Sequence, residues 1–509
     1  MEKGARYSMV MIEKKYNQEE EDIKQEKDPL FLPTPFTYGS VSVSQINSNQ
    51  NRLDASAYNI IAMNALTTVR KNKYGWIYLW SDKGLINKAY YPGRYKRIYC
   101  NQHNGIPFFL PSQLDEIYPK PTKYVSRKTA DLLTNDYIKS NMLLISRSGT
   151  IGKCTISSKA TVGKLFSDDV IRITFKDEYD LGYVYTFFNT QIGLSILQSN
   201  NYGAVIDHIE PEHLQNIPIP NAPKEIKKEI HKLIVESYDL RDQSNDLIDK
   251  AQQMLYKELE LPEISAIEPK QYTNGAGFRN YTIKISQSDG RLDASYHLPE
   301  VNSVIDAISH NASEVTTLGD KRISKKIILA GIFKRVYVDS TNGVPFLGGR
   351  DIMQLSPKTE KYLSINAHKD RIEKELSVFE NYILISDRGT IGKIQIVPKH
   401  WNGWAVSQNV IKLVPQSNLA GYIYTYLTTE LAQILIKREI YGSVVDMIDD
   451  ANVAHIPIPL LKNEEIQKQI NDMVLYANDL RYQAYLKEQK ALALMNDLLK
   501  EKKVKLYAQ

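Results

Sequence analysis

The sequence predicts an α+β protein: two mostly-β domains of a tandem duplication, separated by two long helices that pack on each other as a coiled-coil spacer. Three observations predict this fold. Four blocks of sequence recur in order, each copy contains short apolar runs bounded by turn residues, and each copy ends in a long apolar stripe at helical spacing. At 509 residues, the chain is long enough for two or three domains, each with a full-sized core.

The duplication is visible as four blocks that return at a nearly constant shift of about 240 residues, a register that chance similarity does not hold. The pairs are RLDAS at 52–56 and 291–295, GRYKRIYCNQHNGIPF from Gly93 and GIFKRVYVDSTNGVPF from Gly331, LIS with GTIGK at 144–153 and 384–393, and YGAVIDHIEPEHLQNIPIP from Tyr202 and YGSVVDMIDDANVAHIPIP from Tyr441.

Both copies have the same internal plan. Short apolar runs such as Met142–Ile145, between Ser, Gly and Asn residues, predict strands. The pairs Asn104-Gly105 and Asn342-Gly343 are strong turn formers, because both residue types accept a positive φ. Each copy is expected to contain a β portion, a short helix and an extended Ile-Pro-Ile-Pro connector, at 41–180, 181–199 and 217–220 in the first and at 283–420, 420–438 and 456–459 in the second.

Each copy then ends in a long amphipathic helix. Alternating steps of three and four between apolar residues are typical of a coiled-coil seam. Stripes of the same period at the end of each copy are most simply explained if the two helices pack on each other; the alternative is that each packs on its own β domain. The stripes are Ile226, Ile230, Leu233, Leu240, Leu247 and Met254 in the first helix and Ile466, Ile470, Met473, Ala477, Leu480, Ala484, Ala491, Leu494 and Leu498 in the second.

These patterns divide the chain into six parts. A charged, proline-containing arm without a counterpart in the second copy comes first, and a glycine-containing linker joins the copies. The expected parts are the N-terminal arm 1–38, the first mostly-β domain 39–220, spacer helix 221–260, linker 261–282, the second mostly-β domain 283–460 and second spacer helix 461–503.

Composition narrows the class of protein. Cys100 and Cys154 are the only cysteines and form no CxxC pair, which argues against a cysteine zinc site and for a reducing compartment. There is no basic-then-apolar leader and no apolar run near the roughly 18 residues that span a bilayer, so we expect a soluble cytoplasmic protein. The net charge of +5 does not decide whether the protein binds DNA.

Two similar but diverged domains held apart by a stiff helical pair suit asymmetric duplex DNA, in which two short words lie a fixed distance apart. The two copies agree closely at turn glycines, connectors and helices, and poorly between them, as in 107–136 against 345–376. This is the pattern expected if the scaffold is kept while the surface that contacts the bases changes.

The order of elements resembles the specificity subunit of Type I restriction–modification systems. The resemblance covers about 470 residues, all but the N-terminal arm, and its repeated order is more specific than any single motif. The RLDAS segments also resemble related subunits of Type IIB-like systems, which leaves the subtype open. The resemblance depends on Leu144–Lys153, its twin Leu384–Lys393, Gly349–Ile352, and the Ile-Pro-Ile-Pro stretch before each long helix.

Several properties are implied by the resemblance alone. Each target-recognition domain of that family binds one half of a bipartite site. The helices form an antiparallel spacer that docks two adenine-N6 methyltransferase subunits, so S-adenosylmethionine is expected on that partner and no cofactor in this chain. A restriction subunit is a further expected partner whose presence the sequence leaves open. Along the spacer we expect Ile226, Leu233, Leu240, Leu247, Ile466, Met473, Leu480 and Leu494 to face the partner helix.

The GTIGK loops supply the first DNA-contact candidates. Turn glycines let backbone amides approach a phosphate, and Lys153 and Lys393 add charge. The alternative is a plain β-turn, and the spacing is not that of a P-loop. Lys96-Arg97 and Lys334-Arg335 recur at matched positions, which favours phosphate contact over base choice, with a charged strand edge as the alternative.

Other candidates differ between the copies. Arg147 aligns with Asp387, and Arg388 with Ser148, a shift that suits arginines reading different guanines. Asp168 (followed by Asp169) aligns with Gln408 (followed by Asn409). Amides can bond adenine and carboxylates can accept from cytosine, so Asp168, Gln408 and Asn409 are base-reading candidates. Arg350 lies in the Gly-Gly-Arg-Asp block that the resemblance places near the duplex.

Catalysis within the chain is not expected. No Asn-Pro-Pro-Tyr or Asp-Pro-Pro-Tyr segment is present for adenine methyl transfer, and the nine histidines form no HExxH or HxH metal motif. The sequence therefore predicts a non-catalytic DNA-recognition subunit without a metal. Two alternatives remain open: a divergent nuclease on a duplicated DNA-binding scaffold, and a coiled-coil scaffold whose β domains bind protein.

Overall fold

The computed structural model describes residues 41–48, 59–199, 208–267, 273–275, 278–288, 290–357, 361–442 and 444–500. The chain divides into two units, 1–60 and 61–509. The first contains α2 (Val43–Ser48), and the two copies and both long helices belong to the second. The predicted arm 1–38 and the first RLDAS block lie outside the described residues.

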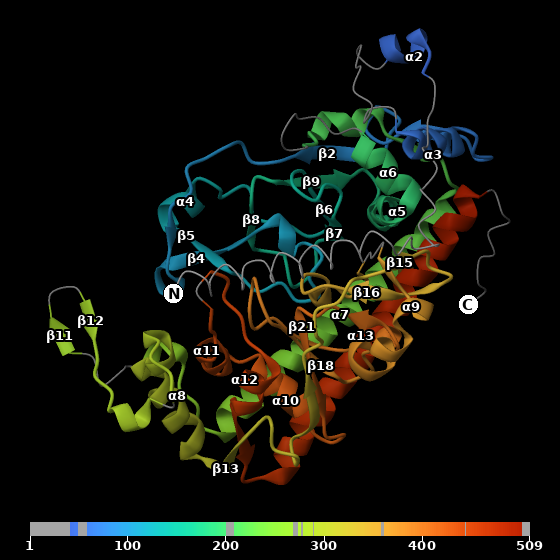
Figure 1. The fold of residues 1–509 in the computed structure, drawn as a ribbon. Helices are drawn as coiled ribbons and strands as arrows, with labels where there is room; N and C mark the ends of the chain where they lie inside the picture. The colour runs from blue at the N-terminus through green and yellow to red at the C-terminus, as the bar shows by residue number, and fades with distance from the viewer. Residues whose placement is uncertain are drawn as a thin grey trace, which may run out of the picture. The chain divides into compact units, whose positions relative to one another are not determined.

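The β portion of the first copy consists of two four-stranded sheets (Figure 1). The order β2-β9-β6-β7 defines one sheet and β3-β5-β4-β8 the other, in which β4 and β8 run parallel. The strands are β2 (Ile86–Tyr90), β3 (Tyr99–Cys100), β4 (Gly105–Phe109), β5 (Lys123–Ser126), β6 (Leu143–Ser146), β7 (Cys154–Ile156), β8 (Leu165–Phe166) and β9 (Val170–Phe175), with the short helix α4 (Arg127–Asp131) after β5.

The second copy repeats this arrangement, with sheet orders β14-β21-β18-β19 and β15-β17-β16-β20. Its first sheet carries an irregularity at Ser324/Lys326 where the first copy has one at Ile86/Lys88. The strands are β14 (Ser324–Ile328), β15 (Tyr337–Val338), β16 (Gly343–Leu347), β17 (Tyr362–Ser364), β18 (Ile383–Ser386), β19 (Ile394–Ile396), β20 (Ala405–Val406) and β21 (Val410–Pro415), with α9 (Ile365–Arg371) after β17.

Strand β6 shows why these apolar runs become central strands. All four of its residues are buried. Leu143 and Ile145 belong to the large core shared with the helices, whereas Leu144 packs on the opposite side with Phe109 and Phe166. A strand buried on both faces requires a continuous apolar run rather than an alternating one, and β18 repeats the pattern.

Two helices, rather than the one predicted, follow each β portion. They are α5 (Glu178–Asn189) and α6 (Gln191–Ser199) in the first copy and α10 (Ala420–Leu427) and α11 (Glu430–Arg438) in the second. Thr190 and Thr429 cap the second helix of each pair and accept from the backbone N–H groups of Gly193 and Ala432. A side-chain cap of this kind is a common start of a new helix.

The Ile-Pro-Ile-Pro connectors are extended, as predicted, and they pair with strands from the start of each copy. Strand β10 (Pro218–Pro220) is antiparallel to β1 (Trp76–Tyr78), and β22 (Pro457–Leu461) to β13 (Ala312–Thr317). Prolines are tolerated because each of these sheets has only two strands. The remaining helices are α3 (Ile60–Arg70), its counterpart α8 (Pro299–His310), and α12 (Asp450–His455); the predicted linker contains a hairpin of β11 (Thr273–Gly275) and β12 (Phe278–Asn280).

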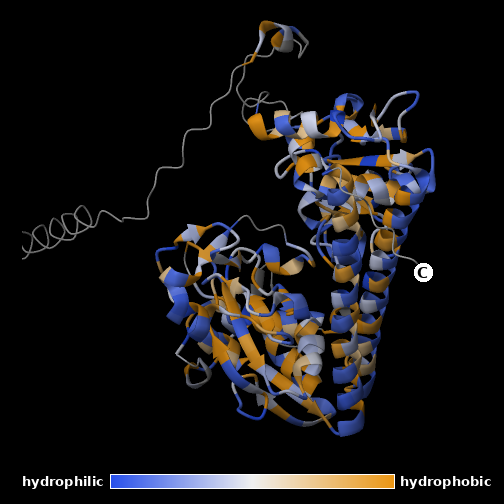
Figure 2. Ribbon diagram, turned by 90° about the vertical axis from the view of Figure 1, so that its right-hand side faces the viewer, coloured by the Kyte–Doolittle hydropathy of each residue, from blue (hydrophilic) through white to orange (hydrophobic). Residues whose placement is uncertain are grey.

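The two long helices, α7 (Lys224–Glu258) and α13 (Glu464–Leu499), lie side by side and antiparallel (Figures 1 and 2). The start of α7 shares a core with the end of α13, through Ile226, Leu233 and Leu494, while the end of α7 shares another with the start of α13. The spacer pairing predicted from the repeated stripes is therefore present.

The buried face of the pair is wider than the predicted seam. Ile234 and Ile248 are buried outside the predicted stripe, whereas Leu240, Leu247 and the predicted seam residues Ile466 and Met473 are only partly buried, and Leu480 is buried. The cause is that α7 also packs on α5, and α13 on α10. A helix that contacts two neighbours needs a broader apolar face than a two-stranded coiled coil.

The Asn-Gly turns were predicted for the wrong reason. Neither Gly105 nor Gly343 has a positive φ. A Cβ at Gly105 would lie 2.5 Å from the Cβ of Tyr124, and one at Gly343 would lie 2.8 Å from the Cβ of Tyr362. Glycine is required at both positions by the close approach of the neighbouring strand, not by the turn conformation.

Candidate nucleic-acid interface

The predicted DNA-contacting residues that differ between the copies meet at one edge of each β portion. In the first copy, the N–H of Arg147, just after β6, donates to the carbonyl of Asp169 at 3.0 Å, and the N–H of Ile209 donates to the carbonyl of Arg147 at 3.0 Å. Three chain segments are thereby joined. The second copy repeats both bonds, at 3.3 Å and 3.0 Å, through Asp387, Asn409 and Ile448.

Two further pairs of candidates are brought into direct contact. Arg97 forms an ion pair with Asp168 in the first copy. At the same place in the second copy, Nη2 of Arg335 donates to Oε1 of Gln408 at 2.7 Å. The acid neutralises Arg97, whereas the amide leaves the charge of Arg335 uncompensated. The two edges therefore present different charge and different hydrogen-bonding groups from one shared geometry.

Arg147 and Asp387, although aligned, are both buried and held in place. Arg147 is 7% exposed, forms an ion pair with Glu210, and lies over the ring of Tyr91 at 4.1 Å. Asp387 is fully buried, and burial raises the pKa of its carboxyl group. Arg147 is thus positioned as a scaffold residue of the edge, and base contact by Arg147 stays a prediction that its burial disfavours.

Arg388, the residue after Asp387, is more accessible than Arg147. Its side chain is 36% exposed, and its Nε donates to Asp387 Oδ2 at 2.9 Å. The carboxylate orients the guanidinium, which is a charge-assisted interaction. Arg388 also pairs through its backbone with Met447, beside the exposed side chains of Val444 and Val445.

Arg350 approaches the same edge from another segment. It lies before the short 3₁₀ helix Asp351–Met353 and is exposed. The preceding Gly349 lies next to this edge, since a Cβ there would be in ordinary van der Waals contact, at 3.6 Å, with the carbonyl oxygen of Asn409. Lys96 and Lys334 are exposed neighbours of Arg97 and Arg335. In the second copy, the edge therefore brings together Arg335, Arg388, Gln408 and Asn409. Lys334 and Arg350 lie on adjoining segments, and Arg350 also lines the cavity that contains Lys153.

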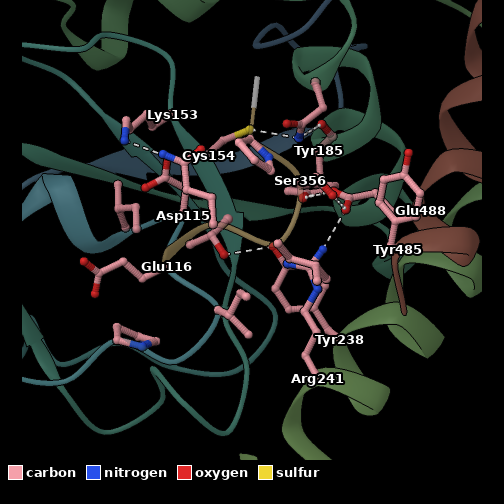
Figure 3. Close-up of a pocket in the computed structure, with 18 of the residues that line it drawn as sticks. Asp115, Glu116, Lys153, Cys154, Tyr185, Tyr238, Arg241, Ser356, Tyr485 and Glu488 are labelled. Carbon is pink, nitrogen blue, oxygen red and sulfur yellow. Dashed lines mark hydrogen bonds and ion pairs between the residues drawn. The ribbon is translucent and has the colours of Figure 1, made fainter. Parts of the chain in front are cut away.

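The GTIGK lysines point elsewhere. Gly149, Gly152, Gly389 and Gly392 all have a positive φ, so the turn geometry itself requires glycine. Nζ of Lys153 lies 2.6 Å from a carboxylate oxygen of Asp115 (Figure 3). Nζ of Lys393 reaches across to Glu116 of the first copy at 2.9 Å.

These lysines line cavities beside the spacer helices, and Arg350 lines the same cavity as Lys153. Phosphate contact by Lys153 and Lys393 stays a prediction, and their acidic partners compete with it. Asp115 and Glu116 were not identified from the sequence because they lie in a poorly matched stretch. No repeat or spacing in the sequence connects them with the two lysines.

The two copies and both spacer helices are connected at one buried carboxylate. Glu488 of α13 accepts from Tyr185 Oη of α5 at 2.6 Å, from Arg241 Nη2 of α7 at 2.7 Å, and from Ser356 Oγ of the second copy at 3.0 Å (Figure 3). The group lines a cavity of about 580 Å³. Burial raises the pKa of Tyr185, so its hydroxyl remains a donor.

Two classes of site are not found in the described residues. Among them, no group of His, Cys, Asp and Glu side chains is placed to hold a metal ion. None of the helices described is both long and apolar enough to cross a lipid bilayer.

Comparison with known proteins identifies both copies. The family model of the type I restriction modification DNA specificity domain matches residues 82–250 and again 337–475. No curated protein matches the chain.

Solved structures resemble the chain at low identity. The type I restriction–modification S subunit from M. genitalium is 13% identical, with 85% of this chain and 96% of that chain covered and a TM-score of 0.30. A chain from a study of complex assembly and conformational transition of the type I system is 13% identical, with 83% and 97% covered and a TM-score of 0.26. The HsdS subunit from Thermoanaerobacter tengcongensis is 14% identical, with 85% and 98% covered and a TM-score of 0.25.

Proposed function

Because the chain belongs to the family of type I restriction–modification DNA specificity domains, we propose that it is the subunit that reads a bipartite duplex site and directs partner enzymes to it. The family match covers both copies, so DNA-sequence recognition is the role of the chain. The bipartite site, the partner subunits and the contacting residues are the proposed part.

The observation that carries the proposal is that equivalent arginines in the two copies contact side chains of different chemistry. Arg97 and Arg335 occupy the same place, but their partners are Asp168 and Gln408. A carboxylate can accept from cytosine, whereas an amide can make two bonds to adenine. Two edges built alike but carrying different groups, a buried, ion-paired Asp168 beside Arg97 and a partly exposed Gln408 beside Arg335, are suited to two different words.

The antiparallel helices support a fixed gap between the words. Helix α7 has 35 residues, about 52 Å at 1.5 Å per residue. This exceeds one turn of B-DNA, roughly 35 Å. Glu488 fixes the helices to each other and to both copies, which suits a spacer of constant length.

In this proposal, partner subunits catalyse DNA methylation and cleavage. The chain is a non-catalytic DNA-recognition subunit. Two adenine-N6 methyltransferase subunits carrying S-adenosylmethionine dock on the spacer helices and modify the site, and a restriction subunit is the further partner when cleavage occurs. In this proposal the protein acts in the cytoplasm, together with the double-stranded DNA that it binds.

A pair of reciprocal substitutions tests the proposal. Gln408→Asp gives Arg335 the acidic partner that Arg97 has, and Asp168→Gln makes the opposite change. Each variant is co-expressed with the neighbouring methyltransferase gene, and modified adenines are mapped across the genome. We expect Gln408→Asp to change one half of the methylated site, Asp168→Gln to change the other half, and the gap to stay constant in both.

The rival functions predict other results. Cleavage of plasmid DNA by the lone chain with Mg²⁺ would support a nuclease. Binding that is weak, salt-sensitive and without sequence preference would support a protein-binding scaffold. A change in both half-sites from either single substitution would contradict one edge per word.

A further inference from the structure

The two spacer helices carry the same arginine at the same place, with different surroundings. Arg241 on α7 and Arg481 on α13 both follow an Asp-Leu pair. Both side chains line cavities between the helices and the β portions. The two guanidinium groups differ in the acceptors that surround them.

Arg241 has an internal anion. Its Nη2 donates to Glu488 at 2.7 Å, and the same carboxylate accepts from Tyr185 and Ser356. The negative charge of Glu488 therefore has three donors around it. A buried ion pair needs this kind of additional hydrogen bonding to offset its loss of hydration.

Arg481 has no such partner. It is 1% exposed, and the hydrogen bond that its guanidinium makes with the described residues runs from Nη2 to Oδ1 of Asn245 at a weak 3.3 Å. Within the described part of the chain, nothing accepts from its Nε or its Nη1. The position on α7 that corresponds to Glu488 is Ile248, which lines the same cavity and cannot supply a negative charge.

A second buried donor faces the same cavity. Gln395 is 2% exposed, and its Nε2 likewise has no acceptor among the described residues. Tyr424, the twin of Tyr185, also contributes to the wall. Donors without acceptors on two separate elements, β19 and α13, together define a place for a molecule rich in acceptor oxygens.

The charges around the cavity favour an anion. Its lining carries the acids Glu116, Asp249 and Glu430 against Lys120, Lys393, Lys437 and Arg481, one positive charge in excess. Glu116 pairs with Lys393, and Asp249 accepts from Tyr118 at 2.5 Å. The guanidinium of Arg481 remains uncompensated, and a buried arginine without a counter-charge is costly. The cavity measures about 1150 Å³, at the upper end of the size of small-molecule sites.

We propose that this cavity is a binding site for a small oxyanion, a carboxylate or phosphate group, whose oxygens accept from the guanidinium of Arg481 and the amide of Gln395. The planar guanidinium suits both groups, because it can offer two parallel N–H donors. The site goes beyond DNA recognition, and it lies at the junction of the second copy with the spacer.

The test compares four full-length proteins: wild type, Arg481→Met, Ile248→Glu and the control Arg127→Met. Arg481→Met removes the buried charge, and Ile248→Glu supplies the carboxylate that the twin position has. Arg127 is exposed on α4, so its substitution removes one positive charge away from the cavity. Thermal unfolding is followed in inorganic phosphate and in acetate, each matched in ionic strength with sodium chloride.

An anion at ten times its Kd multiplies the folding equilibrium constant about elevenfold. We expect phosphate, acetate or both to raise the Tm of wild type and of Arg127→Met by roughly 1 to 3 °C. We expect no rise in Arg481→Met or Ile248→Glu, and a higher starting Tm for Ile248→Glu. The anion that gives the larger shift identifies the preferred group.

Two outcomes would overturn the proposal. One is a Tm that does not respond to either anion in wild type. The other is a response of the same size in Arg481→Met, which would place the anion elsewhere, for example on the DNA-binding edge. If Ile248→Glu does not fold, Arg481→Met alone decides, since an apolar side chain of similar length is tolerated at a buried position more readily than an unpaired charge.

Discussion

Protonation of His400 is expected to destabilise the junction between the second copy and the spacer. The ring of His400 is stacked on Tyr485 of α13 with 3.8 Å between centroids. Its Nε2 lies 2.9 Å from the carbonyl oxygen of Leu355 and must therefore carry the proton. Nδ1 is buried and has no partner among the described residues. A proton on Nδ1 would thus create a buried charge without an acceptor.

The size of the effect follows from the pKa. Burial lowers the pKa of His400 from 6.5 to about 4. The unfolded chain binds a proton near pH 6.5 while the folded state does not, so acid favours the unfolded state. The stabilisation from keeping the ring neutral is complete above pH 6.5 and is lost as the pH falls toward 4. Between pH 7.5 and pH 5 the loss is about 2 kcal/mol.

The measurement is urea unfolding of wild type and His400→Gln at both pH values. Glutamine can donate to the carbonyl of Leu355 but does not titrate, so the difference in pH dependence between the two proteins isolates this ring. We expect wild type to lose about 2 kcal/mol more than the variant. Equal losses, or a His400 NMR resonance that titrates near pH 6.5, would refute the reasoning.

Three further predictions concern recognition and the spacer. Inserting four residues into both α7 and α13 should lengthen the gap between the half-sites by about 6 Å, roughly two base pairs, and leave both half-site sequences unchanged. Altered half-site sequences in methylome sequencing would contradict the assignment of spacing to the helices and of base contact to the β edges. Arg388→Ala should change one half-site, whereas the control Ser148→Ala, at the matching position of the first copy, should change neither. Uniform weakening of DNA binding on all sequences would make Arg388 a phosphate contact. Glu488→Leu leaves Arg241 unpaired and should cost about 3 to 5 kcal/mol in urea unfolding, most of which returns when Arg241→Met is added; no recovery would show that packing, not charge, is responsible.

The large-scale fold could be predicted because repetition and period are both local properties of a sequence. The duplicated blocks fix the order of elements, and the stripes of α7 and α13 fix their apolar faces. The antiparallel arrangement then follows from which halves share a core, through Ile226 with Leu494 at one end of the pair. The width of the buried face of the helix pair was less predictable, because the contact of α7 with α5 depends on tertiary packing.

The candidate site was only partly predictable. Arg97 and Asp168 are 71 residues apart and Arg335 and Gln408 are 73 apart, yet both pairs were selected as candidates and the structure brings both together. The partner of Lys393 could not be found in this way. Glu116 belongs to the other copy, 277 residues away, and no repeat predicts a contact between copies.

The twin positions show how one scaffold presents different side chains at its two edges. Positions that fix the backbone are kept, such as the N–H of Arg147 and of Asp387 bonding to Asp169 and Asn409. Their side chains differ, because a backbone bond constrains only the main chain. At Glu488 the side chain itself makes the connection. It contacts both copies, and the matching position of α7 is Ile248, which cannot make these bonds. The central connection is therefore asymmetric, and a substitution at Glu488 should disturb the spacing of the two edges without altering what either edge contacts.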